Sequence, residues 1–304
     1  MKFFAKTDLG SKRQVNQDYY IAENRKVGIF PNVFIVADGV GGNRDSGYAS
    51  KHCSDFVIDQ LMLSKNGSDY EEELAKAYRL ANTDLVYRVM ANPNFTGMGT
   101  TMVLTTVIND RAIVVNVGDS RCYHIRDGIK QITRDHSMAE ELVRANAITR
   151  DSEKYKELKS QLSRAFGQSK KIEPDFFKID LYIGDYILLC SDGLSNMVDD
   201  NRILEIVKED TSIEQKVDNL IIEANKNGGR DNIAIILICI DSINRENSVF
   251  ETERRLLKEE MYETLKGEKQ NLKDILSNRL KNLGNENFHT RSRKKKEGST
   301  DEDK

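Results

Sequence analysis

Four apolar runs of the kind that forms buried strands carry an aspartate at or next to one end, with glycine close by. They are FIVADG with Asp38 and Gly39, VVNVGDS with Asp119, ILLCSDG with Asp192, and GGRDNIAIILI with Asp231. One such aspartate would indicate a turn, because Asp-Gly is a common turn pair. Four of them indicate carboxylates that converge at one edge of a sheet core.

Carboxylates gathered in this way need a partner that cancels their charge. Two of them about 4 Å apart repel by about 4 kcal/mol at an effective dielectric constant of about 20. Protonation or arginine side chains can offset the repulsion, and divalent cations do so best. The four histidines are scattered and no C-x-x-C pair occurs, so an oxygen ligand set favours Mg²⁺ or Mn²⁺ over zinc.

The sequence lacks the motifs of other common phosphate-binding and hydrolytic sites. It has no G-x-x-x-x-G-K-[ST] loop and no G-x-S-x-G elbow. The chemistry that remains is a metal-activated water attacking an electrophile. Lys12 or Arg13, in GSKRQVNQDYY, would indicate that this electrophile is anionic, but Arg13 is equally typical of a solvated surface charge.

Strand-like and helix-like segments are interspersed along the first part of the chain. Runs rich in Val, Ile, Leu and Thr predict strands at 33–37, 101–108, 112–117, 123–126, 186–190 and 233–240. Apolar residues at helical spacing predict helices at 46–62, 70–91, 138–147, 152–165 and 211–226. Ser68 and Ser212 are candidate helix starts, and Asn109-Asp110 and Asp127-Gly128 are candidate hairpin turns.

Charge and composition exclude several classes of function. The net charge of −3 gives no electrostatic case for nucleic acid. The longest apolar run, about eight residues at 233–240, is far short of the roughly 20 that span a membrane, and the N-terminus is too polar for a signal peptide. Four singly spaced cysteines are expected to be free thiols, which favours a cytoplasmic location.

The composition changes after residue 242, where charged residues replace the apolar strands. Residues 243–284 are expected to form a charged amphipathic helical extension, with Leu257, Met261 and Leu265 on one helix and Leu272, Leu276 and Leu280 on another. Residues 285–304 are expected to be a disordered charged tail. The favoured interpretation is an extension lying against the domain; docking of a partner or of a second copy of the chain is the alternative.

Eight segments in sequence order resemble the bacterial form of the metal-dependent protein phosphatases of the PPM type (type 2C). They are SKRQVNQDYY, VADGVGGNRDSGYAS, GMGTTMVL, NVGDSRCY, TRDHSMAEELVRANAIT, LSRAFG, LLCSDGLSNMV and GGRDNIAIILI. The resemblance implies an α+β fold in four α-β-β-α layers, with two antiparallel sheets face to face and helices outside. It also implies a catalytic domain at 1–242 with a mobile flap at about 133–171.

The resemblance also implies which residues hold metal. Asp38 matches the carboxylate that bridges two Mn²⁺ or Mg²⁺ ions, and the Gly39 carbonyl matches a ligand of the second ion. Asp192 and Asp231 match ligands of the first ion. Asp119 matches the residue that helps to hold a third, weaker ion.

Two further matches and three departures concern the surroundings of these ions. Arg13 matches the arginine that grips the substrate phosphate, and Asp18 matches the second carboxylate of the early acidic motif, which we include among the metal ligands. In the implied mechanism, a water or hydroxide between the ions attacks phosphorus in line with the leaving serine or threonine oxygen. Gln17 stands where the family usually has Glu, Val40 where eukaryotic members have His, and Asn43 where bacterial members often have His.

The leading interpretation is a protein serine/threonine phosphatase whose substrates are phosphorylated by a eukaryotic-type serine/threonine kinase. Gln17 and Asn43 leave open a catalytically weakened member that binds phosphoproteins or a partner without turnover. Hydrolysis of a small phosphorylated metabolite is a third interpretation. The intact aspartates favour the first.

Removing the chain after Ser248 tests the two interpretations of the C-terminal extension. If the extension does not dock a partner or a second copy, the truncated protein keeps the subunit state and turnover of the full chain. Light scattering and a phosphatase assay measure both. A change from oligomer to monomer would support docking instead.

Overall fold

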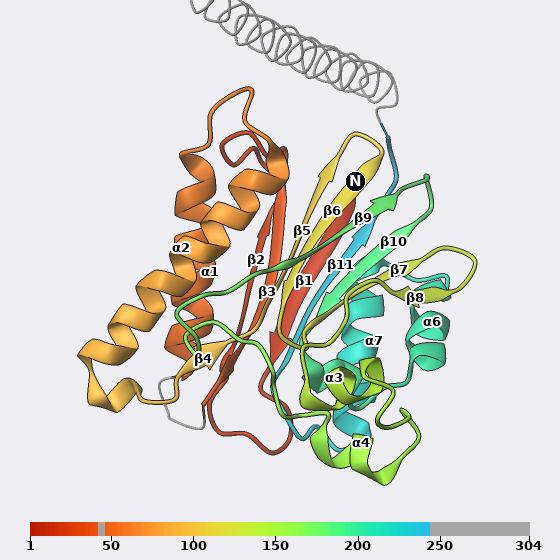
Figure 1. The fold of residues 1–304 in the computed structure, drawn as a ribbon. Coiled ribbons are helices and arrows are strands. Elements are labelled where there is room, and N and C mark those ends of the chain that lie inside the picture. The colour runs from red at the N-terminus through yellow and green to blue at the C-terminus, as the bar shows by residue number, and fades with distance from the viewer. Residues whose placement is uncertain (42–45, 244–304) are drawn as a thin grey trace, which may run out of the picture. The chain divides into compact units, whose positions relative to one another are not determined.

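The computed structural model describes residues 1–41 and 46–243, which form two antiparallel sheets (Figure 1). The first sheet has the order β1 (Lys2–Asp8), β11 (Ile233–Cys239), β10 (Tyr186–Cys190), β7 (Arg121–Ile125) and β8 (Ile129–Gln131). The second has the order β2 (Asp18–Glu23), β3 (Val33–Val40), β5 (Met102–Ile108), β6 (Arg111–Val117) and β9 (Asp175–Asp180), with β4 (Gly99–Thr100) paired to β3. Four of the pairs, β1 with β11, β10 with β7, β3 with β5 and β6 with β9, join strands that are not consecutive in the chain, so the sheets depend on long-range contacts.

Helices cover the outer face of each sheet. The second sheet is covered by α1 (Ser46–Met62) and α2 (Tyr70–Ala91), and the first by α5 (Asp192–Ser195), α6 (Asp200–Lys208) and α7 (Ile213–Lys226) (Figure 1). Two short helices, α3 (Met138–Arg144) and α4 (Glu153–Leu158), lie in the long connection between β8 and β9, and a 3₁₀ turn at Pro93–Phe95 follows α2. The arrangement confirms the expected four-layer α-β-β-α sandwich.

Alternation of side chains along the strands divides the interior into three cores. In β11, Ala234, Ile236 and Ile238 face the other sheet, while Ile233, Ile235 and Leu237 face the helices. In β3, Phe34 and Val36 face the other sheet. Because successive side chains of a strand point to opposite faces, each strand contributes both to the inter-sheet core and to a helix-covered core.

Most of the predicted elements are confirmed. All six predicted strands are present, α1 and α2 have the predicted bounds, and the two candidate turns join β5 to β6 and β7 to β8. Ser212 caps α7, but the cap of α2 is Asp69 rather than Ser68, with its carboxylate accepting from the backbone N–H groups of Glu71 and Glu72. Strands β1, β2, β4, β8 and β9 and helices α5 and α6 were not predicted; in β1, β2 and β9 a mixed polar sequence buries only part of the side chains.

The predicted helix at 152–165 is wrong beyond Leu158. The backbone N–H of Met138 donates to the Gln161 carbonyl at 2.8 Å, and that of Phe166 donates to the Thr100 carbonyl at 2.9 Å. This stretch therefore pairs with distant backbone instead of forming helical bonds within itself. The predicted segments 243–284 and 285–304 lie outside the described residues, apart from Ile243.

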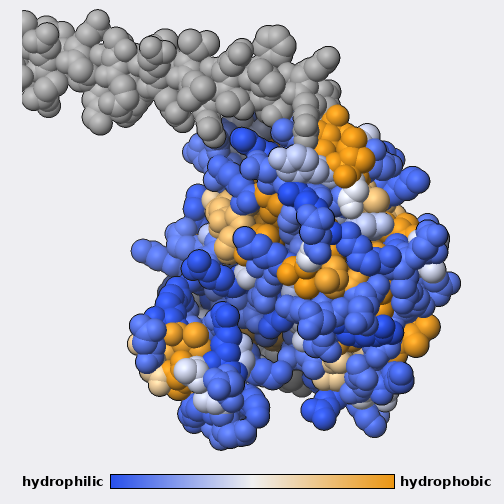
Figure 2. All heavy atoms as spheres, turned by 90° about the vertical axis from the view of Figure 1, so that its right-hand side faces the viewer, coloured by the Kyte–Doolittle hydropathy of each residue, from blue (hydrophilic) through white to orange (hydrophobic). Residues whose placement is uncertain are grey.

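Two features concern the distribution of hydrophobic side chains, one on a face of the molecule and one along the described helices. On the face shown in Figure 2, hydrophobic side chains form small separate patches within a mostly hydrophilic surface. None of the described helices combines the length and the apolar character needed to cross a bilayer.

Replacing Ile236 by Ala should measure the contribution of the inter-sheet core. Ile236 is 0% exposed, so the variant should lose about 2–5 kcal/mol of unfolding free energy in urea denaturation. The matched control is Ile222→Ala, at a side chain 61% exposed on α7, which should change stability by less than about 0.5 kcal/mol. Equal losses in the two variants would contradict this account of the core.

Candidate metal centre and active site

Two aspartates lie directly opposite each other on β2 and β3. Asp18 is the cross-strand partner of Asp38, and both occupy strand positions that face the other sheet. The Asp38 backbone is held by Thr101, between β4 and β5: the Asp38 N–H donates to Thr101 Oγ1 at 3.0 Å, and its carbonyl accepts from the Thr101 N–H at 2.9 Å. The pair is therefore placed by strand register rather than by a flexible loop.

Three more aspartates reach the same place from the ends of other strands. Asp119 follows β6, Asp192 is the first residue of α5 just after β10, and Asp231 comes two residues before β11. All three were expected at strand ends, and each lies just outside its strand. Gly193 permits the close approach of two of these segments, because a Cβ at this position would lie 1.9 Å from the carbonyl oxygen of Asn232.

These side chains line one pocket of about 550 Å³ at the edge of the two sheets. The predicted site residues that line it are Arg13, Asp38, Gly39, Asp119, Asp192 and Asp231. Asp18 lies behind this lining: it is buried and interacts at short range with Asp38. Lys12 is exposed and is not among the lining residues, while Gln17 and Val40 are. Asn43 lies outside the described residues.

Two buried carboxylate oxygens in this cluster have no hydrogen-bond partner within residues 1–41 and 46–243. Asp18 accepts a hydrogen bond from Ser191 Oγ at 2.6 Å through Oδ2, but its Oδ1 has none. Asp192 accepts from Asn196 Nδ2 at 2.9 Å through Oδ2, and its Oδ1 also has none. Buried polar atoms are normally paired, so such oxygens are a signal that a cation belongs nearby.

Burial and mutual repulsion make these carboxylates hard to ionise. Burial raises the pKa of Asp18 to about 7 and that of Asp192 to about 6, with Asp231 adding repulsion in both cases. Burial, followed by repulsion from Asp18 and Asp192, raises the pKa of Asp38 well above its ordinary value. The pKa of Asp119 is also raised, by burial and by repulsion from Asp192. A divalent ion would reverse this preference by stabilising the ionised forms.

Arg13 supplies positive charge at the rim of the pocket. Its Nη2 donates to Asp231 Oδ2 at 2.7 Å, and this hydrogen bond raises the pKa of the guanidinium. The side chain is 48% exposed, so its head lies between the acidic cluster and solvent. An incoming phosphate would meet a permanently charged donor there.

The donor set fits Mg²⁺ or Mn²⁺, although the side chains are not yet arranged around an ion. In residues 1–41 and 46–243, no three His, Cys, Asp or Glu side chains have the geometry of a formed metal site. The fit rests on the buried oxygens without a partner and on the pocket lining, which contains no His or Cys among the described residues.

Several pocket residues were not found from the sequence. Arg230, Lys159 and Asn196 line the pocket, and Ser191 supports Asp18 from behind. Asn196 alone had a local signal, because it lies four residues after Asp192 and one helical turn brings such residues together. The others depend on contacts between distant parts of the chain.

Comparison with known proteins agrees with this geometry. The family described as Protein phosphatase 2C matches residues 21–233. The chain is 34% identical over 242 residues to serine/threonine phosphatase stp of Listeria monocytogenes serovar 1/2a, covering 77% of this chain and 93% of that protein. It is 33% identical over 244 residues to protein phosphatase PhpP of Streptococcus pneumoniae serotype 2, covering 80% and 97%.

A solved structure shares the fold. The catalytic domain of the serine/threonine protein phosphatase PstP in complex with two manganese ions matches with a TM-score of 0.67 and 29% identity, covering 78% of this chain and 96% of that one. The two-sheet sandwich with its acidic edge is that of a bacterial metal-dependent phosphatase. The chain belongs to the Protein phosphatase 2C family.

Neutralising one buried carboxylate should change how stability depends on pH. A raised carboxylate pKa means that the ion-free protein loses stability as pH rises from about 3.9 through the folded-state pKa, which for Asp18 is about 7. With a chelator present, Asp38→Asn should therefore melt above the wild type, by a margin that grows between pH 5 and pH 8. Thermal melts measure this, with the exposed Asp127→Asn as control.

Added Mn²⁺ should reverse the order of the two proteins. At 100 times its Kd, an ion stabilises the wild type by about 2.7 kcal/mol, or about 5–10 °C in a domain of this size. The rise in melting temperature caused by Mn²⁺ should be smaller in Asp38→Asn and unchanged in Asp127→Asn. A wild type that melts equally with and without Mn²⁺ would count against a metal centre.

Proposed function

We propose that this chain is a serine/threonine protein phosphatase that uses Mn²⁺ or Mg²⁺ held by the acidic pocket. The observation that carries the proposal is the convergence of aspartates from both sheets on one pocket with an arginine at its rim. Family membership supports it, as does the manganese complex of a structural neighbour. The catalytic domain would span residues 1–242, with the flap at about 133–171.

The residues divide into three roles in this proposal. Asp38 lies between the two sheets and would bridge two ions, with the Gly39 carbonyl on the second. Asp192 and Asp231 would hold the first ion. The third role is that of Asp119, which would help to hold a third, weaker ion, and of the buried Asp18, which we also propose as a metal ligand beside Asp38.

The protein's own groups determine how a phosphate monoester would bind. Arg13 would turn from Asp231 toward the phosphate and donate two charge-assisted hydrogen bonds to its oxygens. Bound divalent ions lower the pKa of coordinated water and offset charge that develops on the phosphoryl group. The pocket opens to solvent beside Arg13, so a serine or threonine on a protein segment could reach it.

The same proposal extends to the substrates and the cellular location. Phosphorylated proteins, modified by a serine/threonine kinase of eukaryotic type, would be the substrates, and the cytoplasm would be the location. The four cysteines are free thiols, three of them buried, which is typical of a reducing compartment.

Activity assays test the proposal directly. The protein should hydrolyse a phosphothreonine peptide with Mn²⁺ and lose that activity in EDTA. Asp38→Ala and Asp192→Ala should lower kcat/KM by at least about 100-fold through lost metal binding. Arg13→Ala should lower it by about 10–100-fold, the equivalent of one or two charge-assisted hydrogen bonds.

The matched control for Arg13 is Arg25→Ala, which removes an exposed arginine paired with Glu23 on the surface. Its activity should equal that of the wild type. A wild type that binds Mn²⁺ but turns over neither the phosphopeptide nor para-nitrophenyl phosphate would overturn the proposal in favour of a phosphoprotein-binding role. Faster turnover of sugar phosphates than of the phosphopeptide would contradict the proposal that phosphorylated proteins are the substrates.

A further inference from the structure

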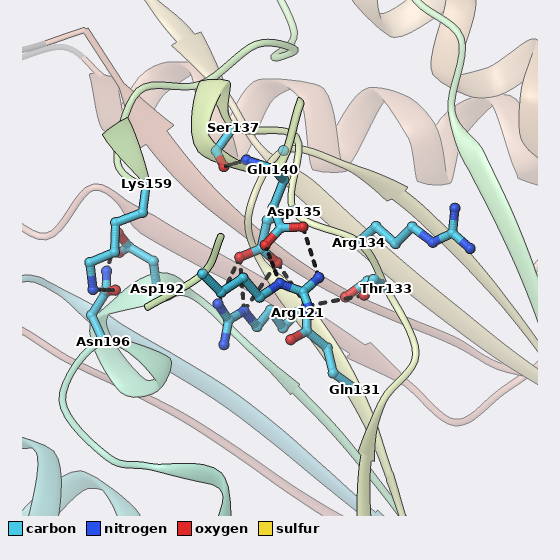
Figure 3. A network of polar contacts seen from close by, with 12 residues as sticks. Arg121, Gln131, Thr133, Arg134, Asp135, Ser137, Glu140, Lys159, Asp192 and Asn196 are labelled. Atoms are coloured by element: carbon cyan, nitrogen blue, oxygen red, sulfur yellow. Dashed lines mark hydrogen bonds and ion pairs between the residues drawn. The ribbon is translucent and has the colours of Figure 1, made fainter. Parts of the chain in front are cut away.

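Lys159 connects the flap, residues 133–171, to the acidic pocket. It directly follows α4, and its Nζ donates to Asn196 Oδ1 at 2.9 Å. Asn196 in turn donates from Nδ2 to Asp192 Oδ2 at 2.9 Å. Figure 3 shows the three side chains side by side, with Lys159 reaching in from the flap. The chain of contacts runs from a lysine on the flap to a carboxylate of the proposed metal centre.

The hydrogen bonds that join these three side chains can run in only one direction. An ammonium can only donate hydrogen bonds and an ionised carboxylate can only accept them. The amide of Asn196 must therefore turn its oxygen to Lys159 and its nitrogen to Asp192. Lys159 and Asp192 favour the same orientation of the amide, and without Lys159 only the hydrogen bond to Asp192 would hold it.

Asn196 also decides which oxygen of Asp192 is available. The amide occupies Oδ2, which leaves Oδ1 as the buried oxygen with no partner. Asp192 interacts at short range with Asp38 and is repelled by Asp231. The orientation of this one carboxylate is therefore fixed by Asn196, and through it by Lys159.

Hydrogen bonds tie α3 and α4 of the flap to each other. Glu140 on α3 accepts hydrogen bonds from Arg150 at 2.9 and 2.8 Å and from the Tyr155 hydroxyl of α4 at 2.8 Å. Near the start of the flap, Arg121 Nη2 of β7 donates to Asp135 Oδ2 at 2.7 Å, and Figure 3 shows this pair near its centre. A displacement of α4 would therefore carry Lys159 with it.

We propose that Lys159 and Asn196 are positioning residues that couple the place of the flap to the affinity of the pocket for divalent ions. When the flap lies over the pocket, Lys159 holds Asn196, and Asn196 aims Asp192 at the cluster. When the flap moves away, Asp192 is free to rotate and the ion is held less tightly. This inference rests on the metal centre of the proposed function and adds a control of ion binding by the flap.

Calorimetric titration with Mn²⁺ alone tests the coupling without any turnover. Lys159→Met and Asn196→Ala should each weaken Mn²⁺ binding by about 10–100-fold, the usual cost of removing a group that orients a metal ligand. The double variant should bind no more weakly than Asn196→Ala, because the two residues act in series. Lys159→Arg keeps a donor and should recover most of the affinity.

Lys154→Met is the matched control, since this exposed lysine lies on the same helix and pairs with Glu157 within the flap. It should bind Mn²⁺ as the wild type does. Hydrogen exchange supplies a second readout: by linkage, Mn²⁺ should slow exchange across α4 in the wild type and leave it unchanged in Lys159→Met. The melting temperature in EDTA shows that each variant is folded.

Three results would overturn the coupling. Unchanged Mn²⁺ affinity in Lys159→Met with a raised KM for the phosphopeptide would make Lys159 a substrate contact instead. Additive losses in the double variant would make the two residues independent. A wild type that binds no Mn²⁺ would contradict both the proposed metal centre and the coupling. Mn²⁺ binding without hydrolysis would overturn only the proposed function, and the titrations of the variants would still decide the coupling.

Discussion

Electrostatic repulsion between buried carboxylates is the constraint on which the rest of this molecule depends. The aspartates come from both sheets, so the repulsion acts across the inter-sheet core as well as within the pocket. The apolar contacts of Phe34, Ile236 and their neighbours must hold the sheets together against it. The contacts that stabilise the fold therefore lie away from the acidic pocket, and the pocket keeps its attraction for cations.

Several neighbouring residues restrain the aspartates through hydrogen bonds. Ser191, the residue after β10, donates a hydrogen bond to Asp18 on β2 and so links the two sheets at their acidic edge. Thr101 fixes the backbone of Asp38, and Asn196 fixes the carboxylate of Asp192. The restraints come from three separate segments of the chain, so the geometry of the pocket depends on the packing of both sheets.

Part of this site could be read from the sequence, and the reason is geometric. Asp38, Asp119, Asp192 and Asp231 follow or precede strongly apolar runs, and such runs are recognisable without knowledge of their neighbours. Asp18 had no such signal, because β2 is half polar and its importance comes from its partner across the sheet. Lys159 was placed in a predicted helix that ends earlier, and its contact with Asn196 spans 37 residues of chain. Pairings of that kind depend on the fold and leave no local pattern.

The register of β2 against β3 has a consequence for how such a chain can vary. Tyr20 and Ala22 share a face with Asp18, whereas Ile21 packs under the helices. A slip of one residue would set Tyr19 opposite Asp38 and turn Asp18 toward α1. A single residue inserted inside either strand would therefore separate Asp18 from Asp38 and move the apolar side chains beyond it to the wrong face of the sheet.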